Sequence, residues 1–277
     1  MESVSKPVRV GAVLYDPKVS VIWDIIRDFF DGRGCPVDPV FYTSYERQVA
    51  ALVAGEIEVA WNSPLAWLDA QRRTGERCRA IAMRDTDRDR MSHLVARKGV
   101  VHRVADLRGR QLAVGAVDSP QATLIPLDLL RREGLTPGTD VQICRFDVLV
   151  GKHGDHVGGE LDALHSLKEG VSAASAMLDL NWDTWTRDGT LDPHEFHIVG
   201  TTESFDHCVF TVRDGWSRAV EERWLDALFS MSYEDPAHRH MMDLEGLKAW
   251  LPGRTTGFRA LTRAVEAQGF FGGPSRA

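Results

Sequence analysis

The stretch from residue 42 to residue 67 constrains the fold more than any other part of the chain. It contains an amphipathic helix that ends at Gly55, followed by a short β-type run at 57–61. Serine is a favoured N-cap and proline is favoured at the first helical position, so Ser63 and Pro64 predict a helix directly after that strand. A strand that leads into a helix is a unit of an α/β fold, and the N–H groups of the helix start favour an anion.

The same signal occurs a second time. Residues 111–114 predict a strand, and Ser119 and Pro120 repeat the cap and the proline. Ser119, Gln121 and Thr123 then place three short polar side chains at the helix start. Each start alone also fits an ordinary helix cap, but two of them on two α/β units suggest a cleft that holds a small acidic ligand.

Composition excludes several classes of function. The chain has 277 residues, enough for one large domain or two medium lobes. Its net charge of −7 argues against a nucleic-acid partner. We expect no zinc framework or dense disulfide scaffold, because the four cysteines are far apart in sequence and form no CxxC motif: Cys35, Cys78, Cys144 and Cys208. No Walker loop or dinucleotide-binding fingerprint occurs, and we expect no cofactor.

The N-terminal residues bear on location. Residues 1–7 are short and polar, and a strand at 8–14 follows them without the apolar core of a signal peptide. The chain as written is therefore expected in the cytoplasm, and in the periplasm or outside the cell only if an export signal was removed. No stretch is long and apolar enough to predict insertion into a membrane.

Strands and helices alternate along most of the chain, which predicts an α/β fold with mainly parallel sheets flanked by helices. We expect two crossings between two lobes, near residues 93–99 and 203–212, that act as hinges. Lobe one then comprises residues 1–94 and 206–277, lobe two comprises 95–205, and the ligand cleft lies between them. The expected strands are at 8–14, 40–42, 57–61, 78–83, 92–97, 111–114, 141–146, 173–178, 197–201 and 205–212, and residues 216–277 are expected to be mostly helical.

Ligands of such sheets bind beyond the carboxyl ends of the strands. Four polar or aromatic residues of the first lobe fall at such ends: Tyr15, Tyr42, Asn62 and Ser63.

The sequence resembles the phosphonate-, phosphate- and phosphite-binding proteins of ABC importers, which have a type 2 periplasmic-binding-protein fold. The resemblance covers residues 8 to 215. Its matching segments are Tyr45-Glu46, 55–60, Ser63-Pro64, 107–114, Asp118-Ser119, Ile125-Pro126, 153–155 and 176–179.

The resemblance implies roles for individual residues. Hydroxyl and N–H groups at the second-lobe helix start would hold the ligand oxygens, which assigns that role to Ser119, Gln121 and Thr123. An aromatic ring of the first lobe, Tyr42 or Tyr45, would close over the ligand. Asp179 would lie near a ligand amine. The family's run at this helix start is richer in serine and threonine than the run from Ser119 to Thr123 in this chain. A carboxylate ligand therefore also fits this chain.

The densest polar cluster lies at residues 151–160, between a strand and a helix. His156 and Glu160 are four residues apart and, with His153, have the spacing of a metal site. A histidine paired with Asp155 could act as a general acid or base near neutral pH. The third interpretation is ligand recognition or loop structure, to which Lys152 would add a charge-assisted hydrogen bond. We expect no metal here and assign His153 and His156 to ligand binding.

Asp206 and His207 lie on the second crossing. Neighbouring strand residues point to opposite faces, so one of them faces the cleft, and His207 is the candidate. Cys208 is interpreted as a small buried hydrophobe.

Two functions from different classes follow. The first is a solute-binding protein that clasps a small anionic metabolite, phosphonate-, phosphate- or carboxylate-like, by hinge closure, with an ABC permease as partner if the chain is exported. The second is a cytosolic enzyme on the same fold, with dehydratase or lyase acid–base chemistry carried by His153, Asp155, His156 or Glu160. The fold alone does not decide between them.

Overall fold

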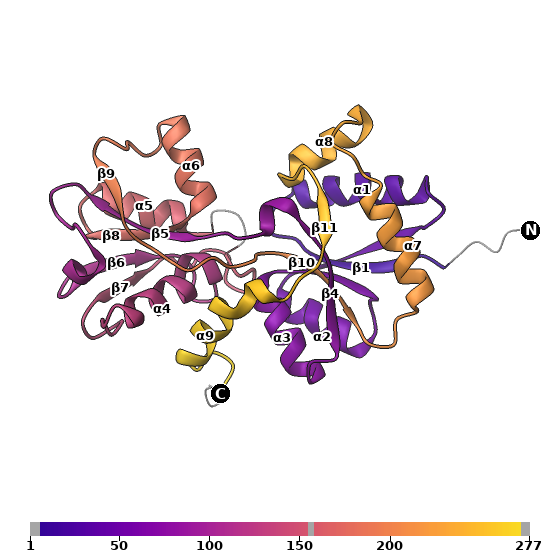
Figure 1. Cartoon of the computed structure of the whole chain (residues 1–277), viewed down its shortest axis with the longest axis horizontal. Helices are drawn as coiled ribbons and strands as arrows, with labels where there is room; N and C mark the ends of the chain where they lie inside the picture. The colour runs from indigo at the N-terminus through magenta and orange to yellow at the C-terminus, as the bar shows by residue number, and fades with distance from the viewer. Residues whose placement is uncertain (1–5, 155–157, 273–277) are drawn as a thin grey trace, which may run out of the picture. The chain divides into compact units, whose positions relative to one another are not determined.

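The computed structural model describes residues 6–154 and 158–272 (Figure 1). The chain forms two compact units: unit 1 comprises residues 1–88 and 206–256, and unit 2 comprises 89–205 and 257–277. The chain therefore passes between the units three times.

Unit 1 is built on a six-stranded sheet with the order β11-β4-β10-β3-β1-β2. β1 pairs in parallel with β2 and β3, whereas β10 is antiparallel to β3 and β4, and β11 is antiparallel to β4. The strands are β1 (Val8–Val13), β2 (Val37–Tyr42), β3 (Val59–Asn62), β4 (Cys78–Arg84), β10 (Val209–Arg213) and β11 (Trp250–Pro252).

Helices cover both faces of this sheet. Figure 1 shows α2 (Tyr45–Ala54) and α3 (Pro64–Thr74) together on one face. The other face carries α1 (Lys18–Asp31), α7 (Arg218–Phe229) and α8 (Pro236–Glu245). The core on this second face is rich in aromatic rings, and Phe210 of β10 contacts Trp23, Trp61, Trp224 and Trp250 there.

Unit 2 is built on a five-stranded sheet with the order β7-β6-β8-β5-β9. β6 pairs in parallel with β7 and β8, and β5 is antiparallel to β8 and β9. Its elements are β5 (Ser92–Arg97), β6 (Gln111–Val114), α4 (Ile125–Arg132), β7 (Gln142–Arg145), α5 (Glu160–Lys168), β8 (Ala174–Leu178), α6 (Asp179–Asp188), β9 (Phe196–Thr201) and α9 (Arg259–Ala267). Short 3-10 turns lie at Asp85–Asp87, Val104–Leu107 and Thr256–Phe258.

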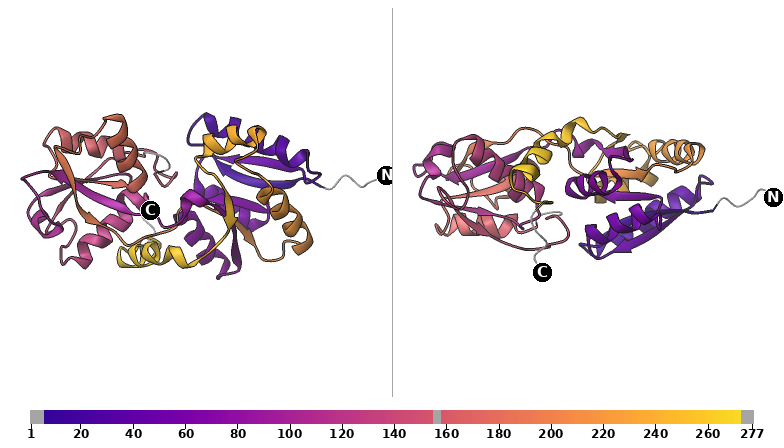
Figure 2. Two further views of the ribbon diagram at one scale, coloured as in Figure 1. Left: turned by 45° about the horizontal axis from the view of Figure 1, so that its top comes forward. Right: turned by 90° about the horizontal axis from the view of Figure 1, so that it is seen from below.

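The C-terminal helix corrects the expected domain assignment. The sequence predicts that all of residues 206–277 belong to lobe one, but α9 (yellow in Figure 2) belongs to unit 2 and packs against α4. Polar contacts hold it there: Arg263 pairs with Asp128 at 2.8 Å, and the Gln268 amide donates to the Leu124 carbonyl. Because these partners are more than 100 residues apart, no local sequence pattern reports the contact.

The α/β class and the alternation of strands and helices are confirmed, and most strand positions agree within a few residues. The C-terminal region departs from the expected helical content because β11 extends the edge of the unit 1 sheet. Among the described residues, no helix has the length and apolar character needed to cross a membrane.

Candidate functional site

The carboxyl edge of the unit 1 sheet gathers several residues singled out in the sequence. β1 and β2 are in register with Val13 opposite Tyr42, and β3 lies on the other side of β1. The ends of these three parallel strands therefore lead into Tyr15, Tyr42, Asn62 and Ser63 at one edge, as the strand order requires.

The first helix start, at Ser63, has the geometry of a capped α-helix. The Ser63 hydroxyl accepts the Ala66 N–H at 3.1 Å, and Pro64 occupies the first helical turn. Asn62 beside it is fully buried, and its side-chain oxygen accepts from Gln48 at 2.8 Å. The Asn62 Nδ2 has no hydrogen-bond partner within the described part of the chain. This start therefore offers one buried amide donor.

The tyrosines differ in position. Tyr45 lies within α2 and is only 1% exposed, so its ring is part of the interior of unit 1 rather than a cover at the surface. Tyr15 is half-buried and packs against the aromatic core. Tyr42 is half-buried, and burial raises the pKa of its phenol. Of the two candidates for a closing ring, only Tyr42 is partly exposed.

The second helix start, at Ser119, begins as a π-helical turn (Pro120–Leu124) and continues as α4. The cause is Pro126, which has no N–H to donate back along the helix. The two carbonyls that this N–H would serve find other donors: the Ser92 hydroxyl bonds the Gln121 carbonyl at 2.6 Å, and the Gly115 N–H bonds the Ala122 carbonyl at 3.2 Å. The wide turn is thus fixed from β5 and from the end of β6.

The three polar residues of this turn are all buried. The Ser119 hydroxyl caps the Ala122 N–H at 3.2 Å, and the Gln121 amide donates to the Gly154 carbonyl at 2.9 Å. Thr123 is 1% exposed, and its hydroxyl has no hydrogen-bond partner among residues 6–154 and 158–272. Such a buried polar group is uncommon in folded proteins and calls for an explanation.

Two glycines allow the surrounding loops to approach this turn. A Cβ on Gly115 would lie 2.6 Å from the Cβ of Ala122. A Cβ on Gly154, which has a φ of +67°, would lie 2.5 Å from the Ser119 hydroxyl. Glycine is therefore required at 154 both by the backbone conformation and by contact with the turn.

Glu160 lies at the first position of α5 and is fully buried. Its Oε2 accepts from the Leu178 N–H at 2.8 Å and from the Asn181 amide at 2.6 Å. Burial is the main reason that the pKa of this carboxyl is raised to about 7, and the nearby Asp179 adds to the effect. The other oxygen, Oε1, has no partner in the described structure, and neither does the oxygen of the Gln121 amide. Gln121 is a neighbour of this carboxyl, and its contact lowers the pKa of Glu160 against the larger effect of burial.

These contacts bear on the part of the metal hypothesis that involves Glu160. Glu160 turns into the interior and is held by β8 and α6, so it is not a metal ligand presented by the loop. Asp155 and His156 fall outside the described residues. His153 is buried and adopts a φ of +54°. Asp179 begins α6 and lies 3.6 Å from Arg90, an ion pair that the sequence analysis did not anticipate.

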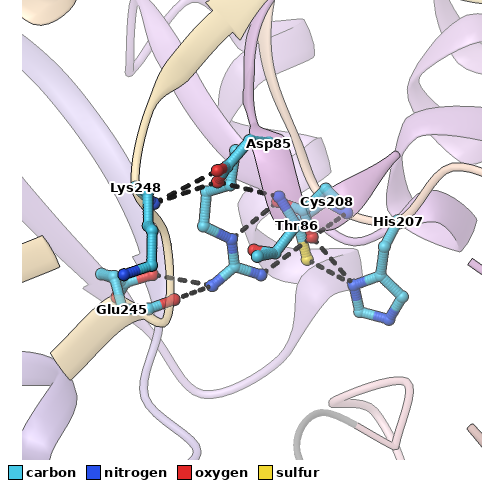
Figure 3. A network of polar contacts seen from close by, with 8 residues as sticks. Asp85, Thr86, His207, Cys208, Glu245 and Lys248 are labelled. Atoms are coloured by element: carbon cyan, nitrogen blue, oxygen red, sulfur yellow. Dashed lines mark hydrogen bonds and ion pairs between the residues drawn. The ribbon is translucent and has the colours of Figure 1, made fainter. Parts of the chain in front are cut away.

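A polar network that local sequence patterns did not reveal lies where β4 ends (Figure 3). Because β3 and β4 are both antiparallel to β10, this is the same edge of the unit 1 sheet as Ser63. Arg84 at the end of β4 makes two hydrogen bonds to the Asp87 carboxylate, at 2.6 and 2.9 Å, and pairs with Glu245 at 2.9 Å. Arg84 holds the pKa of Asp87 well below its usual range, despite burial. His207 and Cys208, just before β10, contact Asp87 from the other side.

Asp206, in contrast, points inward. It is fully buried and paired with Arg254 at 2.5 and 2.6 Å. His207 keeps 12% of its side chain exposed. The expected alternation between these neighbours is therefore present, with His207 as the more exposed of the two. The chain separation of Arg84 from Glu245, and of Asp206 from Arg254, explains why sequence spacing did not reveal these ion pairs.

The chain is similar to a known family over most of its length. A model of the family described as ABC transporter, phosphonate, periplasmic substrate-binding protein matches residues 24–258. The chain belongs to this family, which confirms the resemblance noted in the sequence. The family is described as periplasmic, so the expectation of a cytoplasmic protein is not supported.

Solved structures agree on the fold. PhnD1 from Prochlorococcus marinus (MIT 9301), in complex with methylphosphonate, superposes with a TM-score of 0.71 at 14% identity, over 95% of this chain and 98% of that one. XAC2383 from Xanthomonas citri, bound to ATP, gives 0.69 at 19% identity, over 95% and 96%. The periplasmic aliphatic sulphonate binding protein SsuA from Escherichia coli gives 0.60 at 13% identity, over 96% and 87%.

A curated relative gives less information. An uncharacterized protein of Haemophilus influenzae is 49% identical over 39 residues, which are 14% of this chain. The match spans 55% of that relative's length.

Proposed function

We propose that this chain is the solute-binding component of an ABC importer and that it binds a small organic anion, with a phosphonate or sulfonate group, at the Ser119 helix start of unit 2. The observation that carries the assignment of the site is the buried Thr123 hydroxyl, which has no hydrogen-bond partner among the described residues and lies next to the Ser119 cap. Family membership supports the function. The ligand cleft between two lobes and the hinge closure stay predictions.

The energetics of Thr123 favour a ligand oxygen as its missing partner. A buried hydroxyl without a hydrogen bond costs about 1–3 kcal/mol. An anionic oxygen recovers that cost and adds a charge-assisted hydrogen bond, which is stronger than a neutral one. The π-turn suits this role because hydrogen bonds from Ser92 and Gly115 hold its conformation, so that the ligand does not have to form it. The site is thus formed before the ligand arrives.

Exposed valines on the neighbouring loops favour a ligand that carries an apolar substituent. β6 and β7 are adjacent and parallel, so the loops that follow them lie side by side, and the Val117 N–H bonds Asp147 at 2.8 Å. Val117, Val148 and Val150 on these loops are 41%, 41% and 54% exposed. Single exposed valines are ordinary, but three beside one helix start favour an alkyl or aryl anion over inorganic phosphate.

Partners and location follow from the family. A substrate-binding component delivers its ligand to a permease and an ATPase, and we propose both as partners of this chain and the periplasm as its location. The possible amine contact is Asp179, whose carboxylate is already near Arg90. A ligand without an amine therefore fits this chain better than an aminoalkyl anion.

The enzyme alternative has less support. Of its four candidate residues, Glu160 is fully buried and holds β8 and α6, which is a structural role. Ligand that is recovered unchanged after prolonged incubation with the protein would count against catalysis.

The test is a calorimetric binding screen of the full-length chain. It compares methylphosphonate, longer alkyl phosphonates, alkyl sulfonates, inorganic phosphate and short carboxylates at pH 7, with mass spectrometry of each ligand afterwards. We expect micromolar or tighter binding, about −8 kcal/mol or better, of at least one alkyl anion that is recovered intact. Binding of carboxylates alone would contradict the proposed ligand class. Consumption of the bound compound would overturn the proposal in favour of an enzyme.

A further inference from the structure

A second cluster, distinct from the anion site, lies at the carboxyl edge of the unit 1 sheet (Figure 3). Asp87 follows β4, and His207 and Cys208 precede β10, which is the neighbour of β4 in the sheet. One carboxylate oxygen, the imidazole Nδ1 and the thiol sulfur all lie within 4.8 Å of one another. Carboxylate, imidazole and thiolate are the three ligand types that proteins use for zinc.

The separations between these atoms suit a single tetrahedral ion. His207 Nδ1 lies 3.1 Å from Cys208 Sγ and 3.5 Å from Asp87 Oδ1. With metal bonds of about 2.0 Å to nitrogen and oxygen and about 2.3 Å to sulfur, neighbouring tetrahedral ligands lie about 3.3–3.5 Å apart. The two separations from His207 Nδ1 therefore lie within a few tenths of an ångström of the tetrahedral spacing, and Cys208 Sγ lies within 4.8 Å of Asp87 Oδ1.

The arrangement does not fit a catalytic triad. Both Cys208 Sγ and Asp87 Oδ1 approach the same ring nitrogen of His207. In a catalytic triad the thiol contacts one nitrogen of the histidine ring and the carboxylate contacts the other nitrogen. Convergence of three groups on one point is instead what a cation requires.

The local charge balance favours a divalent cation. Arg84 contributes one positive charge, and its two carboxylate partners, Asp87 and Glu245, contribute two negative charges when ionised. A thiolate at Cys208 would add another. Asp87 and a Cys208 thiolate together bring two negative charges to the ion, which match the charge of one divalent cation. Metal binding releases the thiol proton, because the thiolate is the ligand.

The surroundings also fix the ligands in place. Arg84 donates to both carboxylate oxygens of Asp87. The backbone N–H of Cys208 donates to Asp87 Oδ1 at 3.2 Å, and the backbone N–H of His207 donates to the Asp87 carbonyl at 2.7 Å. Outer contacts of this kind orient metal ligands and raise affinity. Ion binding at Oδ1 would weaken its bond from Cys208 or from Arg84, and Arg84 would keep Asp87 through Oδ2.

We infer that Asp87, His207 and Cys208 bind one zinc-like divalent cation, with water as the fourth ligand. The exposed 12% of the His207 side chain gives the ion a path from solvent. The inference stands independently of the anion site, because all three residues belong to unit 1.

The experiment is a Co²⁺ titration of the full-length protein, reduced and stripped of metal with a chelator that is then removed. A Co²⁺–thiolate bond produces a sulfur-to-cobalt absorption band, which reports the cysteine ligand directly. We expect the band to saturate at one equivalent and to disappear when Zn²⁺ is added. Cys208→Ser should abolish the band, and His207→Ala should weaken Co²⁺ binding at least about 100-fold.

The matched control is Cys78→Ser, because Cys78 is another buried thiol in the same sheet, on the strand next to β10. It should leave the band and the stoichiometry unchanged. Absence of the band in the wild-type protein, or its persistence in Cys208→Ser, would overturn the inference. If Cys208→Ser does not fold, His207→Ala decides the question, since full Co²⁺ affinity in that variant also rules the site out.

Discussion

The carboxyl edges of the two sheets solve the problem of burying polar groups in opposite ways. In unit 1, buried carboxylates are paired with arginines: Arg84 with Asp87 and Glu245, and Arg254 with Asp206. In unit 2, the Ser119 turn is lined by a hydroxyl and an amide, and beside them lies a carboxyl, Glu160, whose pKa is raised to about 7. The arginines of unit 1 are thus engaged by carboxylates, whereas the turn of unit 2 contains the Thr123 hydroxyl, which has no hydrogen-bond partner within the described residues.

This difference teaches where an anion is recognised. A fully compensated ion pair has little to offer a ligand, because its charges already have partners. A buried hydroxyl without a partner stabilises the complex rather than the free protein. We therefore expect the two helix starts, Asn-Ser-Pro and Asp-Ser-Pro, to differ in anion binding because the polar groups around them differ.

The largest expected effect concerns the charge network of unit 1. Arg84→Met leaves two buried carboxylates without their cation and should lower the free energy of unfolding by about 3–5 kcal/mol. Urea unfolding followed by tryptophan fluorescence measures this, because six of the eight tryptophans lie in unit 1. The control Arg27→Met removes an exposed ion pair and should cost no more than about 1 kcal/mol. Equal costs for the two variants would mean that the Arg84 network is not a special feature of unit 1.

The next effect concerns the proton of Glu160. Its pKa of about 7 in the folded protein lies above the ordinary value of about 4.3, so the folded state binds the proton more tightly. The stabilisation is therefore fully present below the unfolded pKa and is lost as the pH rises through 7, amounting to about 3 kcal/mol across that window. Urea unfolding of wild type and Glu160→Gln at several pH values between 4 and 8 measures the difference in slope. Glutamine mimics the protonated acid, so its curve should be flatter, and parallel curves would refute the assignment.

The smallest effects come from the two caps. Ser63→Ala and Ser119→Ala should each cost about 1 kcal/mol of stability, because each hydroxyl serves one helix N–H. Only Ser119→Ala should also weaken ligand binding, since only that start adjoins Thr123, whose hydroxyl has no partner within the described part of the chain. Isothermal titration calorimetry of both variants, beside their unfolding curves, separates the two contributions. Equal losses of affinity would show that the two helix starts bind the ligand alike.

Local sequence signals predicted the strands, the caps and the α/β class, because each depends on residues within a few positions of one another. The Ser63 and Ser119 caps are examples: both were expected from Ser-Pro, and both hydroxyls accept the N–H three residues on. The π-turn was not expected, although Pro126 carries its cause. Its other determinants, Ser92 and Gly115, come from different strands and only the folded sheet brings them together.

Contacts between distant residues account for the other differences. The sequence suggested a polar site at residues 151–160, but the fold turns Glu160 inward and leaves Gln121 as its neighbour. Cys208 was correctly interpreted as buried, yet its position 3.1 Å from the His207 imidazole depends on how the chain enters β10. α9 packs on unit 2 with contacts from Arg263 and Gln268, and no local sequence pattern predicts these contacts.

The most direct test of the central claim is calorimetric binding of the best ligand from the screen to Thr123→Val, with Thr211→Val as control. Both threonines are buried, and the hydroxyls of both lack a partner within the described residues, but Thr211 lies in the middle of β10. Thr123→Val should lose about 10- to 100-fold in affinity, as expected for one hydrogen bond to a charged group, without loss of stability. Thr211→Val should bind like the wild type. Unchanged affinity in a folded Thr123→Val variant would contradict the account.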